Sequence, residues 1–274
     1  MKFGVSTFIT DQGISPTALG TALEERGFDS LFVAEHSHIP ADRQTPYPGG
    51  GDLPDIYYRT LDPFVALTAV AVVTERLLLG TGIALIPQRD PIITAKEVAS
   101  LDLVSGGRVI FGIGVGWNRE EMRNHGADPS TRGRLTDERL RAMRALWTED
   151  TAEFHGEFVD FDPVFAWPKP VQRPHPPIYV GGGEGAFPRV ARLGDAWLAL
   201  SVPPEQLGPQ IERLRALADR EVPVTVYAAS DDPEQIEEYA RLGVERLLFY
   251  VPTMPEGETR AFLDRLADVA ARYR

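Results

Sequence analysis

The chain has 274 residues, of which 43% are hydrophobic and 25% charged, so it can build one large α/β domain or two small ones. Its formal net charge is -12, and because a nucleic-acid partner usually requires a basic surplus, we expect none. Its lack of cysteine excludes disulfides and cysteine-ligated metals.

Strand and helix patterns alternate almost from end to end. The expected strands are 2–7, 29–34, 76–85, 108–113, 177–181, 195–200, 222–229 and 245–251. The expected helices are 15–27, 61–74, 91–105, 132–148, 185–193, 204–220, 232–242 and 256–272. Eight such units predict an α/β fold, a (β/α)8 TIM-type barrel, as a single domain over residues 1–274. A doubly wound open sheet is the competing fold.

Two segments interrupt this rhythm. Residues 36–60, rich in glycine and proline, predict a long loop after the second strand, and residues 149–176 predict an irregular insertion before the fifth. Long loops in a compact domain are usually functional. Because the first loop follows the C-terminal end of a strand, we expect it to cover the active face of the barrel.

No apolar run is long enough for a membrane helix, and the N-terminus enters a strand pattern without the features of a signal peptide. The absence of cysteine leaves the compartment open, and a cytoplasmic location is the expectation. The expected partner is a small-molecule substrate, with neither nucleic acid nor membrane, and a homodimer is the candidate assembly.

Three of the expected strands end in glycines, in segments 77–87, 109–117 and 177–183. A glycine within a strand marks a bulge, a bend or the close approach of a ligand. Because the C-terminal ends of parallel strands meet at one rim, these segments predict one ligand site.

Several motifs resemble the bacterial luciferase-like monooxygenase superfamily over roughly residues 1–200. They are KFGVST, ERGFDSLFVAEH, GTGIALIP, TAKEVASLDLVSGGRV, GRVIFGIGVGWNREE and PIYVGGG followed by ARLGDAW. Within the superfamily the chain looks most like the branch that uses the deazaflavin coenzyme F420. The resemblance implies hydride transfer between F420 and a small organic substrate, with an FMN-dependent monooxygenase as the alternative.

The resemblance also implies where the cofactor ring lies. In this family the bulge of the third strand often contains a non-prolyl cis peptide against the ring, which points to Gly82 and Ile83. A polar residue often stands near the reactive ring carbon, where Glu35 and His36 follow the second strand. A histidine can donate a hydrogen bond or pass a proton near neutrality, so His36 and Glu35 are the catalytic candidates. The plainer alternatives are a bulge that curves the barrel and a structural histidine.

Glycine-rich ends predict the phosphate site. Gly114 and Gly116 would let backbone amides approach a ring or phosphate, with Trp117 as a wall. Gly181-Gly182-Gly183 precedes a helix and can cradle a phosphate, although a tight turn is the alternative.

The arginine-rich segment 119–144 could attract an anionic cofactor to this acidic chain. Arg132 and Arg134, at the start of the expected helix 132–148, are the candidates for contacts with its phosphate or acidic tail.

Two other functions remain open. A pair such as His36 and His38 can begin a metal site, but a metal-dependent hydrolase needs ligands on further strand ends, so no metal residue is assigned. The barrel could also bind a flavin or deazaflavin without catalysis, because no residue is an unmistakable catalytic acid.

Overall fold

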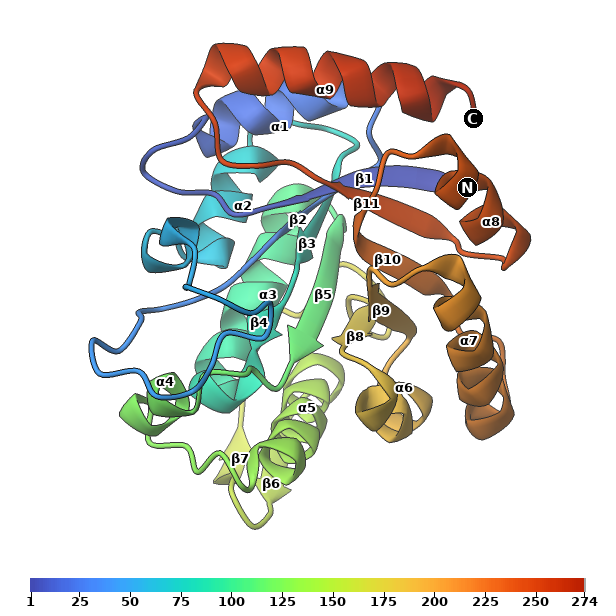
Figure 1. Cartoon of the computed structure of the whole chain (residues 1–274). Helices are drawn as coiled ribbons and strands as arrows, with labels where there is room; N and C mark the ends of the chain where they lie inside the picture. The colour runs from blue at the N-terminus through green and yellow to red at the C-terminus, as the bar shows by residue number, and fades with distance from the viewer. Residues whose placement is uncertain (274) are drawn as a thin grey trace.

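The apolar runs pair side by side in parallel and close on themselves. The structure, a computed structural model, describes residues 1–273. Within them, nine strands form one sheet in the order β3-β2-β1-β11-β10-β9-β8-β5-β4, and a further pairing of β3 with β5 closes eight of them into a barrel (Figure 1). The barrel strands are β1 Lys2–Thr7, β2 Ser30–Val33, β3 Leu78–Thr81, β5 Val109–Gly114, β8 Ile178–Gly181, β9 Ala196–Leu200, β10 Val224–Ala229 and β11 Arg246–Tyr250. The predicted (β/α)8 barrel is confirmed.

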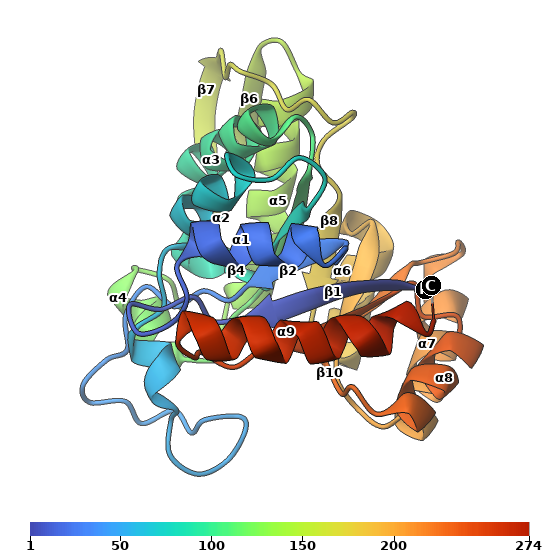
Figure 2. The same ribbon diagram turned by 90° about the horizontal axis from the view of Figure 1, so that it is seen from above.

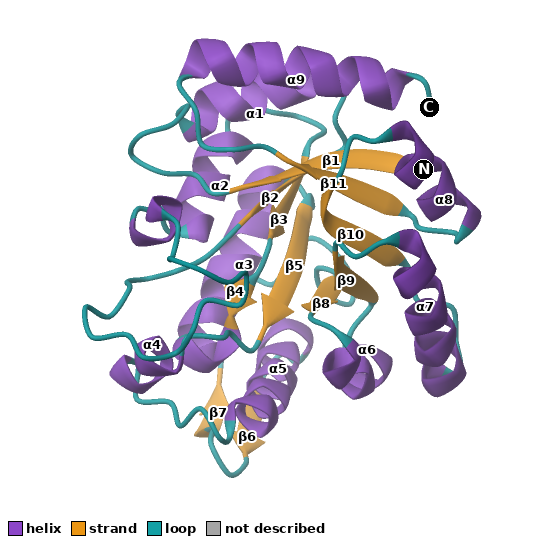
Figure 3. Ribbon diagram, in the orientation of Figure 1, coloured by secondary structure: helices purple, strands orange, loops and turns teal. Residues whose placement is uncertain are grey.

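Helices surround this barrel, as the colouring by secondary structure shows (Figure 3). They are α1 Pro16–Glu25, α2 Pro63–Ala71, α3 Pro91–Ser105, α4 Arg119–Asn124, α5 Arg132–Thr148, α6 Phe187–Leu193, α7 Pro204–Ala218, α8 Pro233–Arg241 and α9 Glu256–Ala271. Short 3-10 turns are η1 Asp55–Tyr58, η2 Ile86–Gln88 and η3 Glu184–Ala186. Asp62, Asp90 and Asp232 cap helices that begin with proline, because each carboxylate accepts a backbone N–H that the helix leaves unpaired. No helix within residues 1–273 is long and apolar enough to span a membrane.

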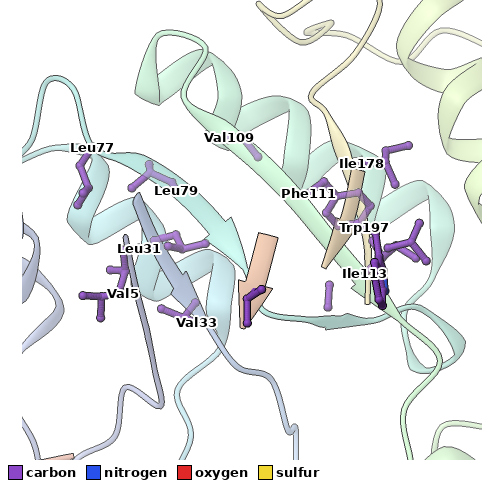
Figure 4. Close-up of a cluster of buried hydrophobic side chains, with 14 of the residues drawn as sticks. Val5, Leu31, Val33, Leu77, Leu79, Val109, Phe111, Ile113, Ile178 and Trp197 are labelled. Carbon is purple, nitrogen blue, oxygen red and sulfur yellow. The ribbon is translucent and has the colours of Figure 1, made fainter. Parts of the chain in front are cut away.

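Alternation along each strand separates two cores. On β5, Val109, Phe111 and Ile113 belong to the large core shared with the surrounding helices, part of which Figure 4 draws. Ile110, between them, belongs to a smaller cluster of strand residues that includes Phe32. Successive side chains of a barrel strand point alternately outward and inward, which explains this division.

The predicted strand 76–85 is divided in the structure. It consists of β3 and a short β4, Ala84–Leu85, and the peptide bond between Gly82 and Ile83 is cis. The Gly82 N–H donates to the Val33 carbonyl at 2.7 Å, which ties the interruption to the end of β2. The strand therefore turns at its C-terminal end, where the site was expected.

The insertion 149–176 is less irregular than predicted. It contains an antiparallel pair, β6 Ala152–His155 and β7 Asp160–Val164. Figure 2 shows this pair at one end of the molecule, beyond α3 and α5, and away from the loop that follows β2. Phe154 and Phe161 face each other across the pair with ring centroids 6.4 Å apart, a cross-strand contact that an irregular insertion would lack.

Candidate functional site

A cavity of about 400 Å³ lies at the C-terminal ends of the barrel strands. Its walls come from the ends of β2, β5, β8, β9 and β10, from the Gly82-Ile83 peptide and from the loop 36–60. Five aromatic side chains dominate its lining: Phe8, Tyr47, Tyr57, Trp117 and Tyr227. The predicted rim is therefore hollow and mainly apolar, as small-molecule sites usually are.

The loop 36–60 closes one side of this cavity, as expected. It supplies Tyr47 and Tyr57, whose hydroxyl oxygens lie 3.3 Å apart. The Thr45 N–H donates to the Glu120 carboxylate at 3.2 Å, so the loop is fastened to the first turn of α4.

Ile83 occupies a slot between two strand ends. A Cβ atom added to Gly114 would lie 1.9 Å from Ile83 Cδ1, and one added to Gly181 would lie 2.9 Å from Ile83 Cγ2. Gly114 therefore makes room for Ile83 and does not itself line the cavity, whereas Gly82, Ile83 and Gly181 do. Gly80 also serves packing, because a Cβ there would meet the Phe32 ring, as close as 2.6 Å.

His36 lies in the cavity wall with its side chain buried. Its Nδ1 is 2.8 Å from Oε2 of Glu121, a residue of α4 that is fully buried. Its ring packs near Tyr57 and Trp117, with centroids 5.1 and 5.8 Å away. Within residues 1–273, Nε2 has no hydrogen-bond partner, so this nitrogen is free to meet a ligand.

Glu35 also reaches the cavity wall, but its carboxylate has partners of its own. Oε2 accepts the Leu85 N–H at 2.6 Å, and Oε1 accepts the Arg89 Nε–H at 2.7 Å. Arg89 also contacts Asp62 at 2.9 Å and Glu97 at 2.7 Å. Burial acts to lower the pKa of Arg89, but the three carboxylates outweigh it and raise the pKa. Glu35 thus fastens β4 and η2 beside the site.

A second cavity of about 390 Å³ adjoins the first and shares Glu35 and His36 with it. Its other lining is largely polar and includes Asp62, Arg89 and His125. Burial lowers the pKa of His125, with the nearby His38 contributing. His36 therefore separates an aromatic cavity from a polar one.

The alternative of a metal-dependent hydrolase finds no set of metal ligands among residues 1–273. His38 hydrogen-bonds with Ser37 at 2.9 Å and with Asn124 at 2.8 Å. Over the part of the chain that the structure describes, no three His, Asp or Glu side chains gather in a way that could hold a metal ion.

Two tyrosines of the aromatic cavity stay protonated over the ordinary pH range. Burial raises the pKa of Tyr57, and its neighbour Tyr47 raises it further. Burial likewise raises the pKa of Tyr227. Both side chains are therefore neutral.

Of the residues predicted to contact the cofactor's ring or phosphate, Gly116, Trp117, Gly181 and Gly182 line the cavity. A Cβ on Gly183, just outside, would meet no atom within 4 Å, so the backbone there lies open to a ligand.

The two predicted arginines lie outside the cavity lining. Arg132 donates to the Pro129 carbonyl at 2.8 Å, and Arg134 pairs with Glu157 at 2.5 Å. The start of α5 nevertheless adjoins α6, because Arg189 of α6 donates to the Gly133 carbonyl at 2.9 Å.

A family model described as luciferase-like monooxygenase matches residues 1–274. The chain belongs to the luciferase-like monooxygenase family. An uncharacterized protein of Mycobacterium tuberculosis is 42% identical over 276 residues, which cover 97% of this chain and 98% of that protein. The FMNH(2)-dependent dimethylsulfone monooxygenase of Pseudomonas putida is 34% identical over 154 residues, which cover 55% of this chain and 42% of that enzyme.

Two solved structures show the luciferase-like fold as well. The monooxygenase RslO1 from Streptomyces bottropensis superposes with a TM-score of 0.80 at 21% identity, covering 100% of both chains. An F420-dependent secondary alcohol dehydrogenase, in complex with an F420-acetone adduct, gives a TM-score of 0.74 at 19% identity, covering 98% of both. At these identities the likeness shows a shared barrel.

Several residues of this luciferase-like site were not predicted from the sequence. Tyr227 could have been predicted from the sequence. It lies within the expected strand 222–229, two residues after Thr225, so both side chains point to the inner face of the barrel. Tyr47 and Tyr57 carry no periodic signal, since they lie in a loop. Glu121 and Arg89 meet their partners His36 and Glu35 only in the folded chain, 85 and 54 residues away.

Proposed function

We propose that this luciferase-like protein is an oxidoreductase that transfers a hydride between the deazaflavin coenzyme F420 and a small uncharged organic substrate. One observation carries the proposal. The aromatic cavity has the Gly82-Ile83 peptide in one wall and His36 in another, and among residues 1–273 the Nε2 of His36 has no hydrogen-bond partner. When bound, F420 would supply the site that accepts or donates the hydride, which no side chain of the protein can do.

The residues around the cavity fit such a cofactor. Ile83, held between Gly114 and Gly181, offers a flat apolar contact for a ring. Gly182 and Gly183 offer backbone for a phosphate, because nearby side chains are small or absent. Arg132 and Arg134 at the start of α5 would meet an acidic tail, and a tail of this kind favours F420 over FMN.

The protein's own part in the reaction is orientation, exclusion of water and movement of a proton. The aromatic lining disfavours water, and the exclusion of water would strengthen electrostatic interactions inside the cavity. His36 Nε2 would take the proton of a substrate hydroxyl, or return a proton to a carbonyl.

The lining also limits the substrate class. Among the lining residues that the structure describes, Glu35 is the one charged side chain, and its carboxylate already accepts hydrogen bonds from Leu85 and Arg89. A charged substrate would therefore find no partner for its charge, and burying an unpaired charge is costly. An uncharged alcohol, ketone or aldehyde fits the aromatic walls and the single imidazole.

Binding of F420 and of FMN to the purified protein tests the cofactor assignment. We expect F420 to bind at least about tenfold more tightly, a difference of about 1.4 kcal/mol. Equal or reversed affinities would remove the F420 assignment and favour the second candidate, an FMN-dependent monooxygenase, which the likeness to the dimethylsulfone enzyme supports. Oxygen uptake with reduced FMN then tests that candidate directly.

Turnover separates an enzyme from a non-catalytic binding barrel. We expect F420 absorbance to fall when an uncharged alcohol reduces the cofactor. We expect it to return when a ketone oxidises the reduced cofactor. Tight F420 binding without turnover of any uncharged substrate would favour the non-catalytic binding barrel.

The expected homodimer remains a prediction. Val65 in α2, Val72 just after it, and Ile93 and Val104 in the adjacent α3 are exposed, and apolar side chains of this kind could lie in an interface. Light scattering of the purified protein measures its mass.

A further inference from the structure

Glu121 is a buried carboxylate with two hydrogen-bond donors. Its side chain is 0% exposed. Oε2 lies 2.8 Å from His36 Nδ1, and Oε1 accepts the Ser37 N–H at 3.2 Å. A backbone N–H can only donate, and an ionised carboxylate has only acceptors, so the ionised form satisfies both contacts.

With Glu121 ionised, this arrangement determines which nitrogen of His36 carries the proton. If Glu121 accepts at Oε2, then Nδ1 must be the N–H of the neutral imidazole, and Nε2 is left with its lone pair. Nε2 is also the nitrogen without a partner, on a side chain that lines the aromatic cavity.

We propose that Glu121 is the positioning residue of His36. It fixes the imidazole ring and its Nδ1–H tautomer, so that Nε2 faces the cavity ready to accept a proton. This inference rests on the proposed function, because it gives His36 the substrate's proton to handle. Glu121 itself lies outside the described lining of both cavities.

The fold holds Glu121 in place. It lies in the first turn of α4, which Asn118 caps by accepting the Glu121 N–H at 3.4 Å. The next residue, Met122, is fully buried in a cluster with Ala127 and Leu135. The carboxylate cannot turn outward to water without moving this helix.

The other charged or titratable groups near His36 have partners elsewhere. Glu35 is held by Arg89, and Tyr57, whose ring centroid is 5.1 Å away, shares its hydroxyl with Tyr47. His125 lies beyond Ser37, hydrogen-bonded to its hydroxyl at 2.7 Å. None of these bonds is made to the His36 ring, so Glu121 alone among them can select the tautomer.

The first experiment needs no variant of Glu121. Nitrogen NMR of the cofactor-free wild-type protein, with the His36 signal assigned by its loss in His36→Gln, reports the tautomer at alkaline pH. We expect the proton on Nδ1. A proton on Nε2 overturns the proposal, whatever the reaction of the protein is.

The second experiment substitutes Glu121→Gln. Glutamine keeps the size but has one acceptor oxygen and an amide that only donates, so either Ser37 N–H or His36 Nδ1–H faces a donor. We expect mixed tautomers of His36 and a kcat lower by about 10–100-fold, the usual cost of losing such a partner. KM and the dissociation constant of F420 should stay near the wild-type values.

Glu138→Gln is the matched control. Glu138 is also a buried carboxylate, and it accepts the N–H groups of Phe158 at 2.5 Å and Val159 at 2.8 Å, away from the cavity. It should lose stability but keep the His36 tautomer and kcat. If Glu121→Gln keeps both the wild-type tautomer and kcat, the positioning role is wrong. If the tautomer changes while kcat does not, His36 moves no proton in turnover, and that part of the proposed function fails while F420 binding still stands.

Discussion

Glu35→Gln is expected to destabilise the fold rather than to abolish the chemistry. The Glu35 side chain is 8% exposed and that of Arg89 13%, so both charges are largely out of water. Glutamine has one acceptor oxygen for the two donors, Leu85 N–H and the Arg89 guanidinium. Breaking a buried pair costs about 3–5 kcal/mol when the remaining charge has no other partner.

Arg89 keeps two other partners, which reduces this cost. Asp62 and Glu97 stay within 2.9 Å and 2.7 Å of it. We therefore expect a loss of about 2–3 kcal/mol, with one unsatisfied buried donor as its main component. At about 2–4 °C per kcal/mol for a chain of this size, Tm should fall by roughly 5–10 °C.

Urea unfolding followed by circular dichroism measures the loss, and turnover at a temperature where the variant is folded measures the chemistry. Glu97→Gln is the control, because it removes a carboxylate from the same arginine at a side chain that is 33% exposed, and should cost about 1 kcal/mol or less. A Glu35→Gln protein with wild-type stability but no turnover would refute this reasoning and make Glu35 catalytic.

Four further outcomes are expected. Gly114→Ala should push Ile83 into the cavity, since the added Cβ would lie 1.9 Å from Ile83 Cδ1. The affinity for F420 should then fall, while the free energy of unfolding, followed by fluorescence, should change little. Gly182→Asp should bind F420 more weakly than Gly182→Asn by over about 1 kcal/mol, because both share the backbone strain at φ 129° and only the first repels a phosphate. Equal affinities of the two would place the phosphate elsewhere. His36→Ala should lower kcat by about 10²–10⁴ in steady-state assays while F420 affinity stays nearly constant; unchanged kcat would leave His36 structural. Burial acts to raise the pKa of Glu138, but backbone N–H bonds outweigh it and hold the pKa below its usual range, so Glu138→Gln should lose stability at neutral pH. That loss should disappear in urea titrations as the pH falls through the lowered pKa, and a difference that persists in acid would contradict the pKa assignment.

The order of strands and helices was predictable because its signals are local. Asp62-Pro63 marks the start of α2 within a few residues of the helix itself, and the apolar run at 109–113 marks β5. The resemblance to luciferase-like proteins led to Gly82 and Ile83, which line the cavity, and to His36.

The rest of the site depends on contacts between distant segments. Nothing near Glu121 in sequence indicates that its carboxylate meets His36, and nothing near Arg89 indicates its bond to Glu35. The sequence also cannot say what a glycine makes room for. Gly114 was interpreted as a place for a ligand to approach, and the structure fills that space with Ile83.

The slot around Ile83 makes three positions behave as one unit under mutation and selection. Residues 83, 114 and 181 come from three strand ends, yet together they fix how far one side chain rises toward the cavity. A larger residue at 114 is tolerable only with a smaller one at 83, so the two sites should change together among homologues. Ile83→Ala should then rescue Gly114→Ala, and the interaction energy of that double-mutant cycle measures how strongly the barrel wall sets the depth of its own binding site.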